Sequence, residues 1–209
     1  MITIALAGEK GGAGKSTVCA HLAAEAVFRG QSVAILDADP QASIEKWADR
    51  RAQPGKPHVV SAKADRIEQS LKTVSDYDIV FIDTAGKASG ETLAVVRRAD
   101  ITLLPLRPSV LDIETLSKVS DILALAKARR AFAVLNSMLG GIGAEGRFNA
   151  ARDLIREAGL EVAPVALGQR VLFSDSMITG QTAGEVEITS KAAQEIRALY
   201  DWIDEGCHV

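Results

Sequence analysis

The chain has 209 residues, of which 47% are hydrophobic and 24% are charged. These proportions suit one globular domain, residues 1–209, with a sizeable buried core. The formal net charge of −3 excludes a chain that is basic throughout, so any binding of nucleic acid must come from a local patch or from a dimer. Cys19 and Cys207 are far apart and form no C-x-x-C pair, which argues against a disulfide framework and against a zinc or iron–sulfur site.

Two targeting patterns are absent from the sequence. A signal peptide would have a basic segment followed by a long apolar one, but the chain begins with the short apolar run at residues 2–7. No window contains the ~18 consecutive apolar residues that a membrane-spanning helix needs. We therefore expect a cytoplasmic protein with no membrane partner.

Short apolar runs alternate along the chain with helical patterns. Strands are predicted at residues 2–7, 33–36, 58–60, 79–82, 101–105, 131–135 and 162–166. Helices are predicted at residues 15–27, 43–51, 65–74, 90–98, 113–130, 148–158 and 190–204. This alternation predicts an α/β fold with a doubly wound, mostly parallel sheet flanked by helices, whose ligands bind beyond the carboxyl ends of the strands.

A glycine-rich loop follows the first predicted strand directly. Residues 8–17 read GEKGGAGKST and lead into the first helical pattern, so the order is strand, loop and helix N-terminus. Glycines remove side chains where the backbone must turn tightly and aim its N–H groups inward, and the helix adds the positive end of its dipole. This context predicts a phosphate-binding loop. The residues expected to bind the nucleotide are Gly11, Gly12, Ala13, Gly14, Lys15, Ser16 and Thr17.

Three side chains of this loop have separate expected tasks. Lys15 is placed to neutralise the β- and γ-phosphate oxygens of a nucleotide, and the hydroxyl of Ser16 is placed to ligate Mg²⁺. Thr17 is placed to support the α-phosphate. A nucleotide and Mg²⁺ are therefore the expected ligands.

Aspartates end two of the predicted strands. Asp83 follows the strand at residues 79–82 and fits the carboxylate that holds the water shell of a metal ion. The run DTAG at residues 83–86 also has the D-x-x-G form of a switch II turn, in which a glycine N–H can sense a γ-phosphate. Asp37 and Asp39 follow another strand. Such aspartates can equally be turn or helix-capping residues, and the upstream phosphate loop is what favours the metal role.

The loop sequence K-G-G-x-G-K-[ST] at residues 10–16 resembles the deviant Walker A motif of the ParA/MinD superfamily of ATPases. Residues 37–41, DADPQ, closely resemble the second motif of that family, D-x-D-P-Q. The resemblance implies that Lys10 reaches across a nucleotide-sandwich dimer to the phosphates of the partner, and that Asp39 orients the attacking water. It implies Lys10, Lys15 and Asp39 as catalytic residues, and Ser16, Asp37 and Asp83 as residues of the metal site.

Glu9 replaces the first glycine of the strict pattern G-x-x-x-x-G-K-[ST], a glycine that is often absent in this family. A carboxylate beside a phosphate site is unfavourable, so we expect Glu9 to point outward or toward the opposite protomer.

The resemblance covers nearly the whole chain. The family places an asparagine after a later strand, and Asn136 matches it; its amide offers a donor and an acceptor to adenine, although a turn asparagine is the alternative. Residues 163–165 are expected to line the same base pocket. Residues 99–112 and 170–196 also resemble family elements, and the compact length is most like the short plasmid-type, ParF-like ParA proteins.

The resemblance implies a function as a switch with ATP and Mg²⁺ as cofactors. ATP binding would close a homodimer, and hydrolysis stimulated by a ParB-like or other adaptor protein would open it. The dimer would bind DNA nonspecifically, associate with the nucleoid, and segregate or position DNA or a large protein cargo. Candidate DNA contacts, which can equally be solvated helix faces, are Arg129, Arg130, Arg147, Arg152, Arg156, Arg170, Lys191 and Arg197.

Other members of the superfamily suggest alternatives. A membrane-bound switch would need a basic amphipathic C-terminal helix, whereas residues 201–209 are acidic and short. Iron–sulfur carriers need cysteines that this chain lacks, and tyrosine kinases need a terminal tyrosine cluster, whereas Tyr200 stands alone. A metabolic ligase or amidotransferase like dethiobiotin synthetase or cobyrinic acid synthase remains the alternative; the paired Asp37 and Asp39 argue against it.

Overall fold

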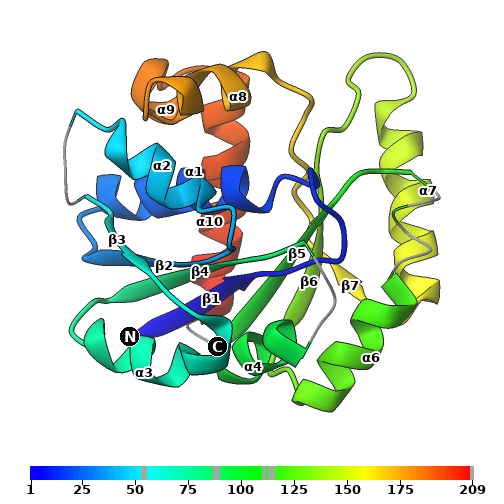
Figure 1. The fold of residues 1–209 in the computed structure, drawn as a ribbon. Coiled ribbons are helices and arrows are strands. Elements are labelled where there is room, and N and C mark those ends of the chain that lie inside the picture. Colours follow the sequence, from blue (N-terminus) through cyan, green and yellow to red (C-terminus); the bar gives the residue numbers. More distant parts are fainter. Residues whose placement is uncertain (53–55, 87–89, 110–111, 113–115, 208–209) are drawn as a thin grey trace.

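The chain forms a parallel β-sheet with helices on both faces, as the sequence predicts (Figure 1). The structure, a computed structural model, describes residues 1–52, 56–86, 90–109, 112 and 116–207. The sheet has seven strands in the order β3-β2-β4-β1-β5-β6-β7. The strands are β1 (Ile2–Leu6), β2 (Val33–Ala38), β3 (His58–Ser61), β4 (Ile79–Thr84), β5 (Ile101–Leu106), β6 (Ala131–Leu135) and β7 (Glu161–Val162).

Two groups of helices cover the two faces of the sheet (Figure 1). The first face carries α1 (Lys15–Phe28), α2 (Ser43–Asp49), α8 (Val171–Ile178), α9 (Ala183–Val186) and α10 (Lys191–Cys207). The second face carries a 3₁₀ turn (Ala64–Arg66), α3 (Ile67–Thr73), α4 (Gly90–Arg98), α6 (Leu116–Ala126) and α7 (Ala144–Glu157). None of the helices in the described ranges combines the length and apolar composition that a membrane crossing requires.

The alternation of side chains along the central strand decides how the two cores are divided. Ile4 and Leu6 of β1 belong to the core under α1 and α10, whereas Ala5 belongs to the core under α3 and α4. All three side chains are at most 1% exposed. A strand buried on both faces is continuously apolar, which is why these runs could be recognised in the sequence.

The register of β2 and β4 brings two acidic residues together. Asp37 and Asp83 are paired directly across these strands, and Leu6, the last residue of β1, pairs with Asp83 on the other side. The loop that follows β1 therefore begins beside both carboxylates. This is the edge at which parallel sheets of this kind bind their ligands.

The observed elements differ from the prediction mainly in the C-terminal third. The last strand has only two residues, α7 begins four residues earlier than predicted, and α6 ends at Ala126 because Lys127 adopts a left-handed conformation. Residues 113–115, the predicted start of α6, lie outside the described residues. We did not predict α8 and α9 as helices. The start of α9 does carry a local signal, a capping box between Thr182 and Glu185.

The turn after α8 packs against the end of α2. Trp47 is fully buried, and its indole N–H donates to the carbonyl of Gln181 at 3.2 Å. Gly180 has a φ of +72°, and a Cβ at this position would overlap the backbone of Arg50 and Arg51. Gly180 is therefore required both by its conformation and by close approach of another segment.

We predict that Gly180→Ala lowers the free energy of unfolding by at least about 2 kcal/mol more than Gly159→Ala. Gly159 is the matched control, because it has a similar φ of +82° but no atom within 4 Å of the added Cβ. The conformational penalty alone should cost about 1 kcal/mol. Urea unfolding measures both, and equal losses would show that the contact with α2 adds nothing.

Candidate nucleotide-binding site

The glycine loop joins β1 to α1 and leaves the helix N-terminus open. Gly12 and Gly14 have φ values of +74° and +96°, which only glycine adopts without strain. Gly14 occupies the N-cap position of α1, where no side chain caps the helix and the first turn has no acidic residue. The first N–H groups of the helix are thus free to bind an anion, and the helix dipole favours one.

Lys15 lies under the loop rather than in solvent. Its side chain is buried, and Nζ donates to the carbonyl of Lys10 at 3.1 Å. Burial lowers the pKa of Lys15, while the charges of Asp83 and Asp39 act in the opposite direction. A buried ammonium group that is only partly compensated favours an anionic ligand above it.

Asp83 has the geometry expected of a metal-site carboxylate. Its Oδ2 accepts a hydrogen bond from the hydroxyl of Ser16 at 2.6 Å, whereas Oδ1 is buried and has no hydrogen-bond partner among the described residues. Burial raises the pKa of Asp83 to about 7, and the nearby Asp37 adds to the shift. A bare carboxylate oxygen beside a hydroxyl fits Mg²⁺, which prefers few protein oxygen ligands together with phosphates and water.

Asp37 has a structural task that the sequence analysis weighed only as an alternative. Its carboxylate accepts hydrogen bonds from the N–H groups of Asp39, Ile44 and Glu45, at 3.2, 3.0 and 3.0 Å. The last two belong to the first turn of α2, so Asp37 caps this helix from inside the protein. It lies beside Asp83, but its oxygens are already engaged.

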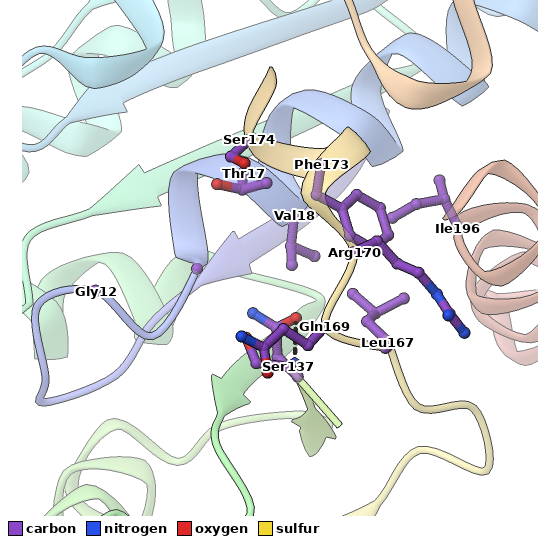
Figure 2. Close-up of a pocket in the computed structure, with 13 residues that line it drawn as sticks. Gly12, Thr17, Val18, Ser137, Leu167, Gln169, Arg170, Phe173, Ser174 and Ile196 are labelled. Atoms are coloured by element: carbon purple, nitrogen blue, oxygen red, sulfur yellow. Dashed lines mark hydrogen bonds between the residues drawn. The ribbon is translucent and has the colours of Figure 1, made fainter. Parts of the chain in front are cut away.

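Two hollows meet above the loop. A cavity of about 790 Å³ extends from the loop to Asp39 and to two exposed cations, Lys46 of α2 and Arg50 directly after it. A smaller cavity of about 240 Å³ lies on the other side of the loop (Figure 2). Figure 2 shows Thr17 and Ser174 at one end of the smaller cavity and Ser137, Leu167 and Gln169 at the other. Both cavities border Gly12, Gly14, Thr17 and Ser174, and together they form one trough of the shape that a nucleotide needs.

The expectation that residues 163–165 line the base side of this trough is wrong. Ala163 is fully buried in the core under α1, and the smaller cavity is lined by Leu167–Arg170 instead. The reason is that β7 ends at Val162 rather than at residue 166, so the chain leaves this strand earlier than predicted. It is held there by hydrogen bonds between Leu167 N–H and Leu135 O and between Met138 N–H and Leu167 O.

Asn136 lies at the bottom of the trough and contacts the phosphate loop. Its Nδ2 donates to the carbonyl of Ala13 at 2.8 Å, and its Oδ1 accepts from the N–H of Ser137 at 2.8 Å. It also borders the smaller cavity, where a base would lie. The sequence analysis identified Asn136 as a site residue, but it did not foresee the contact with the loop.

Two charged residues at the start of the loop are held by partners from the same chain. Lys10 forms an ion pair with Asp112, with 2.8 Å between Nζ and Oδ1. Glu9 forms an ion pair with Lys118 of α6, at 3.0 Å, although its Oε2 is buried without a partner. Glu9 is thus held against α6 of its own chain, which offers the opposite charge.

Sequence reasoning missed four further contacts of the loop. The guanidinium of Arg107 donates to the carbonyl of Gly12 at 2.6 Å, and Asp112 and Lys118 hold the lysine and the glutamate described above. Gly86 of the D-x-x-G turn also lies against the loop, because a Cβ there would come within 2.7 Å of the N atom of Gly11. Arg107, Asp112 and Gly86 lie in segments that resemble the family and Lys118 does not, but nothing in the sequence pairs any of them with the loop.

The candidate DNA-contacting arginines do not form one open basic surface. Arg170 pairs with Glu195 at 2.7 Å and borders the smaller cavity, so it is not a surface cation. Lys191 is exposed. The other candidates form ion pairs with acidic side chains or donate to backbone carbonyls of the same chain: Arg129, Arg130, Arg147, Arg152, Arg156 and Arg197.

Comparisons with known proteins agree with this geometry. The model of the CobQ/CobB/MinD/ParA nucleotide-binding domain matches residues 4–183. The chain belongs to this family. Its ParA/MinD-type relatives include Protein ParA of Rhizobium radiobacter, 29% identical over 183 residues that cover 83% of this chain and 81% of that protein.

A second relative is the maintenance of carboxysome distribution protein A of Halothiobacillus neapolitanus (strain ATCC 23641 / c2), 25% identical over 94% of both chains. Among solved structures, an aspartate-to-alanine variant of Cyanothece McdA in complex with ATP has a TM-score of 0.76 at 14% identity. It covers 98% of this chain and 96% of that chain, and at this identity it supports the fold alone. The chain is thus a nucleotide-binding ATPase domain of the ParA/MinD family.

His21 connects the first helix of this ParA/MinD-type domain to the segment above it. Its Nε2 accepts a hydrogen bond from the N–H of Ala183 at 3.0 Å, so the neutral ring carries its proton on Nδ1 and donates it to the carbonyl of Thr17 at 2.8 Å. Burial lowers the pKa of His21 to about 4. Protonation of Nε2 would break the bond to α9.

We predict that His21 and Asp83 give the free protein opposite dependences of stability on pH. Between pH 4 and 6.5 the unfolded state binds the proton of His21 and the folded state does not, so this contribution rises with pH. Between pH 3.8 and 7 the folded state binds the proton of Asp83 and the unfolded state does not, so this contribution falls with pH. In the wild type the two should largely cancel.

Asp83→Asn removes the falling contribution, so the stability of this variant should rise from pH 4.5 to 6.5, by at most about 1.4 kcal/mol per pH unit. His21→Gln should give the opposite slope. Urea unfolding at several pH values without nucleotide or Mg²⁺ measures both, and identical pH profiles for the wild type and Asp83→Asn would contradict the prediction.

Proposed function

We propose that this chain is a ParA-type ATPase, folded as one domain, that forms an ATP-bound sandwich dimer and uses ATP binding and hydrolysis to segregate or position DNA or a large protein cargo. The observation that carries the proposal is the different placement of two lysines on one phosphate loop. Lys15 is buried beneath the loop, whereas the Lys10 side chain is 38% exposed at its rim. The names of the ParA and carboxysome-distribution relatives point in the same direction.

Each part of the proposed hydrolysis has a candidate group. The loop amides and Lys15 bind the phosphates, and Asn136 borders the hollow for the adenine. Ser16 and Asp83 hold Mg²⁺, with Asp37 beside them; the ion would supply positive charge to the β- and γ-phosphates. Asp39 borders the larger cavity and orients the attacking water.

In the proposed cycle the ion pair between Lys10 and Asp112 is the resting position of the bridging lysine. A γ-phosphate on a second protomer offers Lys10 a stronger anionic partner than one carboxylate, so the pair exchanges when the dimer closes. Hydrolysis and loss of phosphate remove that partner, and Lys10 returns to Asp112.

We predict that Lys10→Ala retains ATP binding, because Lys15 and the loop amides remain, but loses ATP-dependent dimerisation, because the cross-protomer contact is removed. Asp112→Ala releases Lys10 and should dimerise at least as well as the wild type. Light scattering with ATP in the Asp39→Ala background, which is expected to hydrolyse ATP poorly, measures both. Dimers of normal stability in Lys10→Ala would remove the bridging role.

The proposed DNA binding requires the dimer, because the single chain has a net charge of −3 and its arginines are mostly paired. We expect a gel shift of nonspecific duplex DNA with ATP but not with ADP or without nucleotide, and a strong loss of binding as salt rises. Lys10→Ala is the control and should fail to shift DNA. An active ATPase that binds no DNA in any state, even at low salt, would instead favour another cargo or the metabolic ligase.

A further inference from the structure

Three carbonyl groups of the phosphate loop are held by side-chain donors. Lys15 holds the carbonyl of Lys10 from within the loop. Arg107 holds that of Gly12 at 2.6 Å, and Asn136 holds that of Ala13 at 2.8 Å. Arg107 directly follows β5 and Asn136 directly follows β6, so two neighbouring strands each present one donor to consecutive carbonyls of the loop.

These two hydrogen bonds decide which way the loop amides face. In a trans peptide the C=O and the following N–H lie in one plane and point in opposite directions. Holding the carbonyl of Gly12 therefore directs the N–H of Ala13 away from Arg107, and holding the carbonyl of Ala13 directs the N–H of Gly14 away from Asn136. Without the two donors these peptides could rotate easily, because Gly12 and Gly14 have the least restricted backbones.

Asn136 is closely fitted to the loop. Its Nδ2 occupies the place that a Cβ of residue 14 would need, so Gly14 is required by this contact as well as by its φ. Both ends of the amide are engaged, one by the loop and one by Ser137. These two hydrogen bonds hold the side chain in place, so it can orient the loop whatever base lies in the neighbouring cavity.

Arg107 is anchored through its backbone. Its backbone N–H donates to Oδ2 of Asp112 at 3.3 Å, while Oδ1 of Asp112 accepts from Lys10 at 2.8 Å. The chain after β5 thus contacts the loop at Lys10 and at Gly12.

We propose that Arg107 and Asn136 are positioning residues that preset the phosphate loop, holding the carbonyls of Gly12 and Ala13 so that the amides of Ala13 and Gly14 face the polyphosphate. The proposal rests on the proposed nucleotide binding and deepens it. It assigns both residues to recognition of the phosphate chain rather than of the base. Loss of either side chain should therefore weaken the binding of every ligand that carries the same phosphates.

The test compares the wild type with Arg107→Ala and Asn136→Ala by calorimetric titration with ADP, GDP and inorganic tripolyphosphate, each with Mg²⁺. We expect both variants to bind all three ligands about tenfold more weakly, because one hydrogen bond that orients the loop is lost. Arg107→Lys keeps a donor and should recover part of the affinity. Arg129→Ala is the control, because Arg129 is an exposed arginine at the opposite end of the strands.

Unchanged affinity of Arg107→Ala for tripolyphosphate would overturn the role of Arg107. For Asn136, a loss of ADP affinity with unchanged tripolyphosphate affinity would overturn the positioning role and assign the amide to the base. If Asn136→Ala does not fold, as judged by thermal unfolding without ligand, Asn136→Leu replaces it, since it has nearly the same shape, adds no charge and loses the donor. A wild type that binds none of the three ligands would count against the proposed function itself.

Discussion

The buried charges beneath the phosphate loop are the constraint on which the rest of the site depends. The register of β2 and β4 places Asp37 beside Asp83, and Lys15 is buried where the charge of Asp83 acts on it. Two carboxylates in a desolvated position repel each other, so each needs its own compensation. Asp37 receives it from the N–H groups of α2, whereas Asp83 has the hydroxyl of Ser16 and the charge of Lys15 and, among the described residues, keeps one oxygen without a hydrogen-bond partner. Asp37 therefore stabilises the fold, whereas Asp83 has an oxygen available to bind a cation.

The loop itself is supported from its outer side. Donors after β5 and β6 hold two carbonyls, and the ion pairs of Glu9 and Lys10 connect the start of the loop to α6 and to Asp112. These contacts leave the inner side of the loop to its N–H groups, which is the arrangement that binds phosphate. In the proposed cycle Lys10 is the exception, because it would exchange Asp112 for the phosphates of a second protomer.

The segment above α1 completes the trough. Neutral His21 joins the carbonyl of Thr17 to the N–H of Ala183, and Gly180 lets the turn after α8 approach the end of α2. The residues of this segment that border the smaller cavity are thereby fixed relative to the phosphate loop. The smaller cavity is therefore bordered in part by residues 167–174, far along the chain from the loop, and this segment includes the start of α8, which we did not predict.

The sequence by itself determined the parallel sheet, the phosphate loop and the aspartates at the strand ends. Each of these depends on local order: a strand buried on both faces is continuously apolar, and a loop that must turn at Gly12 and Gly14 needs glycine wherever the fold places it. Only the tertiary structure decided the partners of these residues. Arg107 and Gly12 are 95 positions apart, Asn136 and Ala13 are 123 apart, and Asp37 caps a helix through the register of its strand. The register and the positions of the loops set these contacts, because a single hydrogen bond leaves no periodic trace in the sequence.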